Sequence, residues 1–224
     1  PTKAESLVIG ISGGIDSSVS STLSAMTGLK TIVLSMPIKQ KENQHDLSLK
    51  HQKWLVEKFK NVEAHTISLD NLFKTFSSTL NKFDNEHGFA NSRARLRMTT
   101  LYQVAAANKG IVVGTGNKVE DFGVGFYTKY GDGGVDISPI ADCNKTEVWE
   151  LGRELGILRE IIDASPTDGL WDDGRTDEGQ LGFKYEDLED AMTNPDSPHK
   201  KEYEKIRKQN LHKMEPIPVC KIPS

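Results

Sequence analysis

Cysteine is scarce in this sequence. Only two of the 224 residues are cysteine, and they stand far apart, at Cys143 and Cys220. They form neither a C-x-x-C pair nor a cluster with metal-ligand spacing, which argues against a disulfide-rich secreted scaffold and a zinc ribbon. A reducing compartment, the cytoplasm, is therefore the predicted location.

Long apolar runs and an excess of basic residues are also missing. No stretch reaches the ~18–20 consecutive apolar residues of a membrane span, and the first residues do not have the pattern of a signal peptide. Lysine and arginine total 28 against 32 aspartate and glutamate, which gives a net charge of −4. Nucleic-acid binders usually carry basic patches. We therefore expect neither a membrane nor a nucleic acid as a partner.

The residues that are present are typical of a soluble α/β protein. Hydrophobic residues make up 36% and charged residues 27%, which fits one domain over residues 1–224. Short β-branched runs predict strands at 6–11, 30–36, 62–68 and 110–114, and helical spacing predicts helices at 16–26, 45–59, 72–83, 92–108 and 144–155. This alternation predicts a doubly wound parallel sheet with flanking helices. Two long segments of weak periodicity, 114–138 and 166–182, are expected to be functional loops, and the tail 216–224 to be irregular.

The strongest local motif is the string Gly-Ile-Ser-Gly-Gly-Ile-Asp-Ser-Ser at 10–18, between the first predicted strand and helix. Adjacent glycines allow a tight turn that brings backbone N–H groups close to an anion, and the helix N-terminus favours negative charge. Asp16 would repel a phosphate unless a cation lay between them, which suggests Mg²⁺. The motif is neither a Walker A loop nor G-x-G-x-x-G. A plain glycine-rich turn, or the G-x-S-x-G elbow of α/β hydrolases, remains an alternative.

The string 12–17, Ser-Gly-Gly-Ile-Asp-Ser, resembles the pyrophosphate-binding loop of the N-type ATP pyrophosphatases, which cleave ATP between the α and β phosphates while adenylating a substrate. The tRNA-modifying branch often has paired cysteines and basic surfaces, which are absent here. Further strings, in the right order along the chain, are similar to those of the ammonia-dependent NAD synthetases: 94–98, 114–120, 126–134, 165–170, 177–178 and 212–213. At 114–118 the chain has Gly-Thr-Gly-Asn-Lys where many members have Gly-Thr-Asp-His.

The resemblance implies an adenine nucleotide alpha hydrolase-like, Rossmann-like fold and a set of site residues. Asp16 and Glu120 would be the ligands of Mg²⁺. ATP would be bound by Gly10, Ile11, Ser12, Gly13, Gly14, Ile15, Asp16, Ser17, Thr115, Lys145 and Thr167. Deamido-NAD⁺ would be bound by Arg95, Lys129, Asp136, His212 and Lys213. If the first and fourth strands are neighbours, Glu120 faces Asp16 across one metal ion.

The implied activity is that of a ligase that forms a carbon–nitrogen bond. The chain would convert deamido-NAD⁺, ammonia and ATP to NAD⁺, AMP and pyrophosphate through an adenylated carboxylate, and it would be a homodimer. No side chain is identified as a general base, and no segment of the sequence is similar to a glutaminase domain, so ammonia is the expected nitrogen source. The alternatives are another adenylating amide ligase, similar to GMP synthetase, and a non-catalytic nucleotide-binding module.

Overall fold

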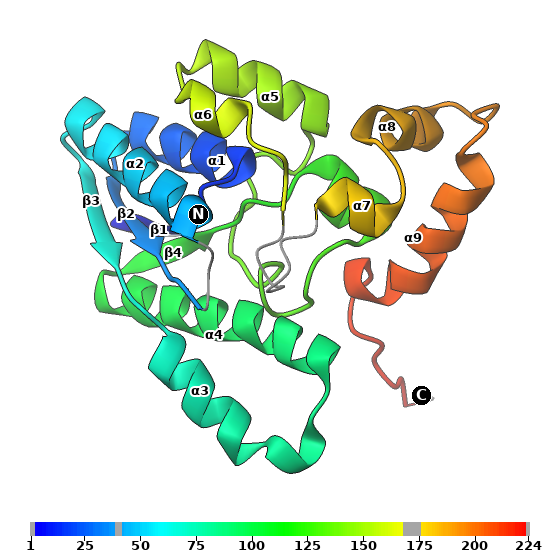
Figure 1. Ribbon diagram of the computed structural model, residues 1–224, viewed down its shortest axis with the longest axis horizontal. Helices are drawn as coiled ribbons and strands as arrows, with labels where there is room; N and C mark the ends of the chain where they lie inside the picture. Colours follow the sequence, from blue (N-terminus) through cyan, green and yellow to red (C-terminus); the bar gives the residue numbers. More distant parts are fainter. Residues whose placement is uncertain (1–2, 39–41, 168–175, 223–224) are drawn as a thin grey trace.

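The computed structural model describes residues 3–38, 42–167 and 176–222. Its centre is a parallel sheet of four strands in the order β3-β2-β1-β4 (Figure 1). The strands are β1 (Ser6–Gly10), β2 (Lys30–Ser35), β3 (Val62–Thr66) and β4 (Gly110–Val113). Val8 of β1 pairs with Ile32 of β2 and with Val112 of β4, so β1 lies inside the sheet. The edge strands are β3 and β4. The predicted doubly wound parallel sheet is confirmed.

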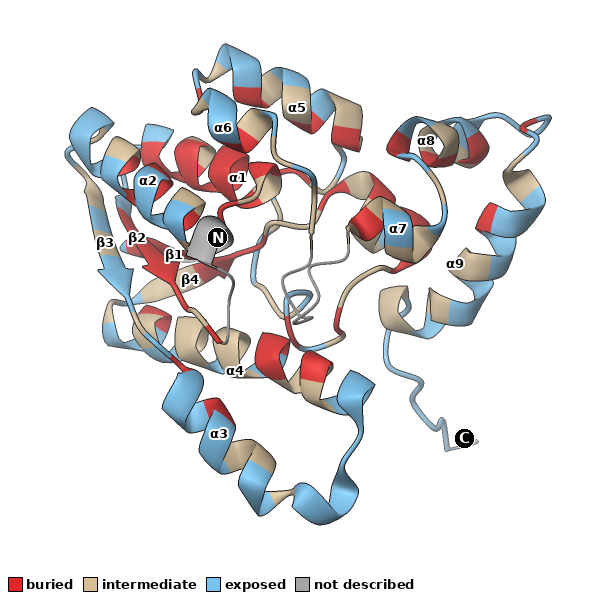
Figure 2. Ribbon diagram, viewed as in Figure 1, coloured by how far each residue is buried: buried red, intermediate tan, exposed pale blue. Residues whose placement is uncertain are grey.

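Both faces of the two inner strands are buried, which is why their sequences are continuously apolar rather than alternating. Val8, Ile32 and Val112 point to one face, and Ile9, Val33 and Val113 belong to the core on the other. All six side chains are buried (Figure 2). Burial of a side chain of this kind contributes roughly 1.5–3 kcal/mol, so these two layers hold the sheet in register.

Helices cover the sheet on both sides (Figure 1). One layer consists of α1 (Ile15–Met26) and α2 (Glu42–Lys58), and α5 (Lys145–Glu154) and α6 (Arg159–Ile162) continue it through the core that they share with α1. The opposite face is covered by α4 (Glu86–Ala107), which packs against β1 and β4, with α3 (Asp70–Thr79) and a short 3₁₀ turn (Asn81–Phe83) beside it.

A separate cluster of elements lies beyond the carboxyl end of β4. It contains a π-helical turn, η2 (Lys118–Val124), and the helices α7 (Asp177–Leu181), α8 (Tyr185–Thr193) and α9 (Lys200–Met214). Val119, Val124, Tyr185 and Leu188 form its buried core. None of the helices in the described parts of the chain combines the length and the apolar character that crossing a membrane requires.

Several predicted boundaries were wrong. Helix α4 begins at Glu86, six residues before the predicted start, because the Asn85 side chain accepts a hydrogen bond of 2.7 Å from Gly88 N and caps the helix there. The predicted loop 166–182 contains α7, and its residues 168–175 lie outside the described part of the structure. Helices α8 and α9 were not predicted. The tail is irregular over 216–222, as expected.

A buried histidine links α2 to α1. His51 Nε2 lies 3.0 Å from Ser21 Oγ, and the His51 ring stacks on Trp54 with their centroids 5.4 Å apart. Burial lowers the pKa of His51 to about 4. An unfolded histidine has a pKa of about 6.5, so between about pH 6.5 and pH 4 only the unfolded chain takes up this proton.

We expect the free energy of unfolding to fall as the pH is lowered through that window, with His51 responsible for a loss of about 3 kcal/mol at pH 4. Urea unfolding at pH 7, 6, 5 and 4 measures this loss. His51→Gln should flatten the decline, whereas His87→Gln, at an exposed position, should leave it unchanged. Equal declines in the wild type and in His51→Gln would contradict the assignment.

Candidate active site

The loop that leads from β1 into α1 is organised by its own hydroxyl groups. Gly13 has a φ of 93°, a left-handed conformation that favours glycine. Ser12 Oγ accepts a hydrogen bond of 3.2 Å from Gly14 N and lies 3.1 Å from Ser17 Oγ. Gly14 is the N-cap of α1, and no side chain caps the helix there. The first N–H groups of α1 are thus oriented towards the loop, an arrangement that suits a phosphate.

The pairing of β1 with β4 brings a second segment to the same edge of the sheet. Thr115 and Glu120 follow β4, and both line the cavity into which the loop 10–17 opens. Glu120 lies in η2, the turn that begins at Lys118. The expectation that Asp16 and Glu120 lie opposite each other when these strands are neighbours is confirmed, since both carboxylates contact the same side-chain nitrogen.

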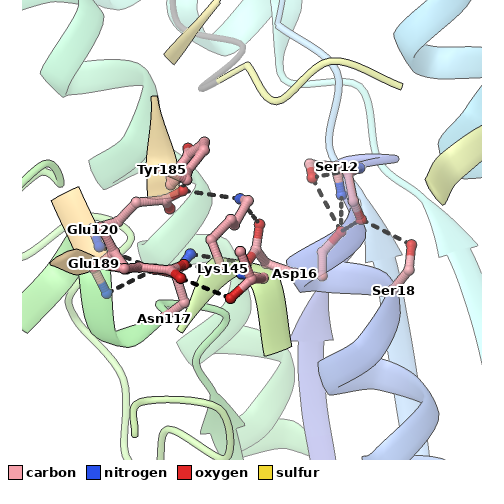
Figure 3. A network of polar contacts seen from close by, with 12 residues as sticks. Ser12, Asp16, Ser18, Asn117, Glu120, Lys145, Tyr185 and Glu189 are labelled. Atoms are coloured by element: carbon pink, nitrogen blue, oxygen red, sulfur yellow. Dashed lines mark hydrogen bonds and ion pairs between the residues drawn. The ribbon is translucent and has the colours of Figure 1, made fainter. Parts of the chain in front are cut away.

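That nitrogen belongs to Lys145, the first residue of α5. Lys145 Nζ lies 2.6 Å from Asp16 Oδ2 and 2.9 Å from Glu120 Oε1 (Figure 3). The Lys145 side chain is only 1% exposed, against 18% for Asp16 and 15% for Glu120. The Tyr185 hydroxyl also donates to Glu120 Oε1, at 2.6 Å. The two carboxylates therefore face a cation that the protein itself supplies.

Asn117 joins the two carboxylate-bearing segments and was not predicted. The Asn117 side chain is fully buried, and its Oδ1 accepts hydrogen bonds from the backbone N of Val119 and of Glu120 at 3.1 and 3.0 Å. Asn117 Nδ2 donates to Asp16 Oδ1 at 3.0 Å. One amide thus caps the turn that carries Glu120 and holds the carboxylate of Asp16 in a fixed orientation. The only sequence signal for this role is an asparagine two residues before an apolar position, a common N-cap pattern.

The three charged groups alter one another's proton affinity. Burial raises the pKa of Asp16 above its usual range, although the Lys145 ammonium opposes this rise. Burial acts in the same direction on Glu120, but Lys145 and the Tyr185 hydroxyl outweigh it and hold the pKa of Glu120 below its usual range. Burial lowers the pKa of Lys145, but its two carboxylate partners outweigh burial and raise that pKa. Lys145 therefore remains protonated at neutral pH.

The donor set is suitable for magnesium. No group of three or more histidine, cysteine, aspartate or glutamate side chains with the geometry of a metal site occurs within the described ranges. Mg²⁺ is usually bound by one or two carboxylates together with substrate phosphates and water, so a complete cage of protein ligands is not needed. Asp16 and Glu120 offer two partly buried carboxylates that converge on one position, beside a loop that suits phosphate.

The cavity beside this network has a volume of about 270 Å³. Its walls are the loop 10–17, the end of β4, residues 131–135, residues 164–167 and one face of α4. Thr167, for which ATP binding was predicted, is among the residues that line it. Arg97 also lines it, with Nε donating to Met36 O at 3.0 Å. Arg97 was missed because Arg95, two residues earlier, carries the family resemblance, and residues two apart on a helix point in different directions.

Four of the residues predicted for the dinucleotide lie close together and are not among the residues that line this cavity. Arg95 Nη2 donates to Lys129 O at 3.3 Å, and Lys129 Nζ donates to His212 O at 2.5 Å. Lys213 Nζ donates to Gly125 O and Tyr127 O at 2.8 and 2.9 Å. The fifth, Asp136, lies apart from them, because its carboxylate accepts from Tyr102 Oη and from Val112 N at 3.1 and 2.8 Å.

Known proteins are similar to this chain in both sequence and fold. A family model described as NAD synthase matches residues 1–222. The chain belongs to the NAD synthase family. An NH(3)-dependent NAD(+) synthetase from Carboxydothermus hydrogenoformans is 40% identical over 192 residues, which cover 83% of this chain and 76% of that protein.

Solved structures agree with membership of the NAD synthase family. The structure of an NMN synthetase from Francisella tularensis superposes with a TM-score of 0.88 at 32% identity, covering 98% of this chain and 91% of that one. An NH3-dependent NAD synthetase from Campylobacter jejuni has the same fold, with a TM-score of 0.77 at 24% identity over 98% of this chain and 91% of that one. NAD synthases are ligases, so the chain is assigned to an enzyme family that forms carbon–nitrogen bonds.

Proposed function

We propose that this chain is an ammonia-dependent NAD synthetase, which converts deamido-NAD⁺, ammonia and ATP to NAD⁺, AMP and pyrophosphate. The observation that carries the proposal is the position of Asp16, within a phosphate-type loop and opposite Glu120, in a chain of the NAD synthase family. Such an arrangement binds the polyphosphate of ATP, and the family indicates which acceptor is adenylated.

The chemistry has two steps. The free carboxylate of the pyridine ring is a poor electrophile because its leaving group would be oxide. In the first step a carboxylate oxygen attacks the α-phosphorus of ATP, the bond from that phosphorus to the bridging oxygen breaks, and pyrophosphate leaves. In the second step ammonia attacks the activated carbonyl carbon and loses a proton, and AMP departs with the oxygen. Both steps depend mainly on positioning and on screening of negative charge.

The residues of the site have matching roles in this proposal. The first N–H groups of α1 and the hydroxyls of Ser12 and Ser17 bind the pyrophosphate portion of ATP. Thr115 and Thr167 line the same cavity and bind ATP. Asp16 and Glu120 hold magnesium, which when bound stabilises negative charge on the phosphates. Arg95, Lys129, Asp136, His212 and Lys213 bind the pyridine nucleotide. No side chain is assigned as a general base.

A second candidate substrate is nicotinate mononucleotide, which would be amidated to NMN. It is favoured by the resemblance to the NMN synthetase of Francisella tularensis, which is 32% identical over 98% of this chain. Both substrates present the same pyridine carboxylate, so the adenylation step would be identical. They differ only in the AMP half of the dinucleotide.

A product assay tests the function and distinguishes the two substrates. The chain is incubated with ATP, Mg²⁺, ammonium and either deamido-NAD⁺ or nicotinate mononucleotide, and NAD⁺, NMN and AMP are separated by chromatography. We expect kcat/KM to be higher for deamido-NAD⁺, with one AMP formed per NAD⁺. A higher kcat/KM for the mononucleotide would transfer the assignment to NMN synthesis, and amidation of neither substrate would overturn the proposal.

The proposal also covers the assembly and the location of the protein. We infer a homodimer, because the resemblance places the dinucleotide site at a subunit interface and two-fold dimers are the commonest oligomers. Light scattering at assay concentration should give twice the mass of the chain, and a monomer would contradict this inference. A cytoplasmic location fits the two cysteines, which are both free thiols in the structure.

A further inference from the structure

The position of the Lys145 side chain depends on the start of α5, which several hydrogen bonds hold in place. Asn144 N donates to Glu147 Oε2 at 2.7 Å and caps the first turn of α5. Thr146 N and Oγ1 donate to the two carboxylate oxygens of Glu189 in α8, at 3.0 and 2.7 Å. The start of α5, and with it the Lys145 backbone, is therefore held both by the first turn of α5 itself and by one neighbouring helix, α8.

Aromatic rings enclose the same ammonium. Lys145 Nζ lies 4.9 Å from the centre of the Tyr185 ring and 6.0 Å from that of Trp149. These two rings pack edge to face with centroids 5.7 Å apart. Together with the carboxylates they form a closed pocket for one cation, and the protein fills this pocket with its own side chain.

The network leaves little room for a second cation between the carboxylates. Asp16 directs Oδ2 at Lys145 and Oδ1 at Asn117, and Glu120 Oε1 already receives both Lys145 and Tyr185. A metal ion that used Asp16 Oδ2 and Glu120 Oε1 would lie within a few ångströms of the ammonium. Two cations at that separation repel each other strongly in a poorly solvated site.

We propose that Lys145 is the internal counter-ion of the magnesium site: its ammonium occupies the cation position between Asp16 and Glu120 until the metal arrives with ATP. The inference deepens the proposed function, because it depends on these two carboxylates being the metal ligands. Lys145 is thus a positioning residue, which keeps the two carboxylates facing each other when no metal is bound. The nucleotide-free protein should then bind divalent cations weakly, and the phosphates of the entering ATP would offer the displaced ammonium a new anionic partner.

Direct metal binding tests the proposal without any turnover. Free Mn²⁺ is measured by electron paramagnetic resonance in titrations of the nucleotide-free protein. We expect Lys145→Met, which empties the cation position, to bind Mn²⁺ about tenfold more tightly than the wild type. Lys118→Met is the matched control, because it removes a positive charge from the neighbouring turn, where Lys118 pairs with the exposed Asp142. This control should bind Mn²⁺ as the wild type does.

Thermal unfolding supplies a second readout. Removal of one partner from a buried ion pair is strongly destabilising, so in EDTA the Tm of Lys145→Met should lie roughly 6–20 °C below that of the wild type. Mg²⁺ should recover most of this loss in the variant, because it replaces the missing cation, but should hardly change the Tm of the wild type without nucleotide. A residue with a purely structural role would give the same loss without recovery by metal.

If Lys145→Met does not fold in EDTA, Mn²⁺ binding and Tm are measured on Lys145→Gln instead. The glutamine amide can still donate hydrogen bonds to the carboxylates but has no charge. Mn²⁺ binding to the variant that is no tighter than to the wild type, or a Tm that Mg²⁺ does not restore, overturns the counter-ion role. Failure of the proposed function would be seen differently, as an absence of amidated product while metal binding to Lys145→Met remained tight.

Discussion

Asp16→Asn and Glu120→Gln are each expected to lower kcat/KM for ATP at least about 100-fold, the largest effect that the structure predicts for a single substitution. Each removes one of the two carboxylates that converge on the cation position, while the length of the side chain is unchanged. With only one carboxylate ligand left, Mg²⁺ should bind more weakly next to the phosphates of ATP. The Mg²⁺ concentration that gives half-maximal rate should therefore rise as well.

Initial rates at limiting and at saturating Mg²⁺ measure both effects. Asp142→Asn is the control: it removes a negative charge on the same side of the molecule, but the Asp142 side chain is 97% exposed and pairs with Lys118 outside the site. Circular dichroism shows whether each variant is folded. Rates of both site variants close to the wild type at limiting Mg²⁺ would show that the metal is held elsewhere.

The second large effect concerns the nitrogen source. At a fixed, subsaturating total ammonium concentration, the rate of NAD⁺ formation is expected to rise about tenfold per pH unit between pH 6 and pH 8. The nucleophile is NH₃, and ammonium, whose pKa lies well above neutrality, releases ten times more of it with each unit. The same rates plotted against NH₃ concentration should fall on one curve. The exchange of pyrophosphate into ATP reports the adenylation step alone, which does not use ammonia. Measured without ammonium, its rate should therefore not rise tenfold per pH unit.

The two cysteines of this chain are poor candidates for a glutamine-cleaving nucleophile. Burial, reinforced by the carboxylates of Glu147 and Asp142, raises the pKa of the Cys143 thiol and disfavours the reactive thiolate. Cys220 is exposed in the irregular tail. We therefore expect Cys143→Ser and Cys220→Ser to retain ammonium-dependent synthesis. Glutamine that served as well as ammonium would contradict the prediction.

The sheet and the phosphate loop were predictable because their signals are local. The strands are short β-branched runs, and the loop is a contiguous motif whose glycines and serines contact one another. Glu120 was placed correctly opposite Asp16 because one topological fact, the pairing of β1 with β4, brings both segments to the same edge of the sheet. The roles of most site residues in binding ATP or the pyridine nucleotide were predicted from the family resemblance and not from a local pattern.

The contacts of Lys145 and Tyr185 were not predictable from the sequence. Lys145 was expected to bind ATP, and its contact with Asp16, 129 positions earlier in the chain, was not foreseen. That contact depends on how α5 packs against α1, and no property of either segment alone determines it. Tyr185 reaches Glu120 from α8, a helix that was not predicted. Such distant side-chain partners follow from tertiary packing and not from motif spacing.

The π-helical turn η2 is held at one end by Asn117 and at the other by helix α9. Arg207 Nη1 and Asn210 Nδ2 of α9 donate to the carbonyls of Gly123 and Val124 at 2.7 and 3.0 Å, at the opposite end of the turn from Asn117. A displacement of α9, which carries His212 and Lys213, would therefore be passed through this one short turn to the carboxylate of Glu120, so the position of that carboxylate depends on the position of α9.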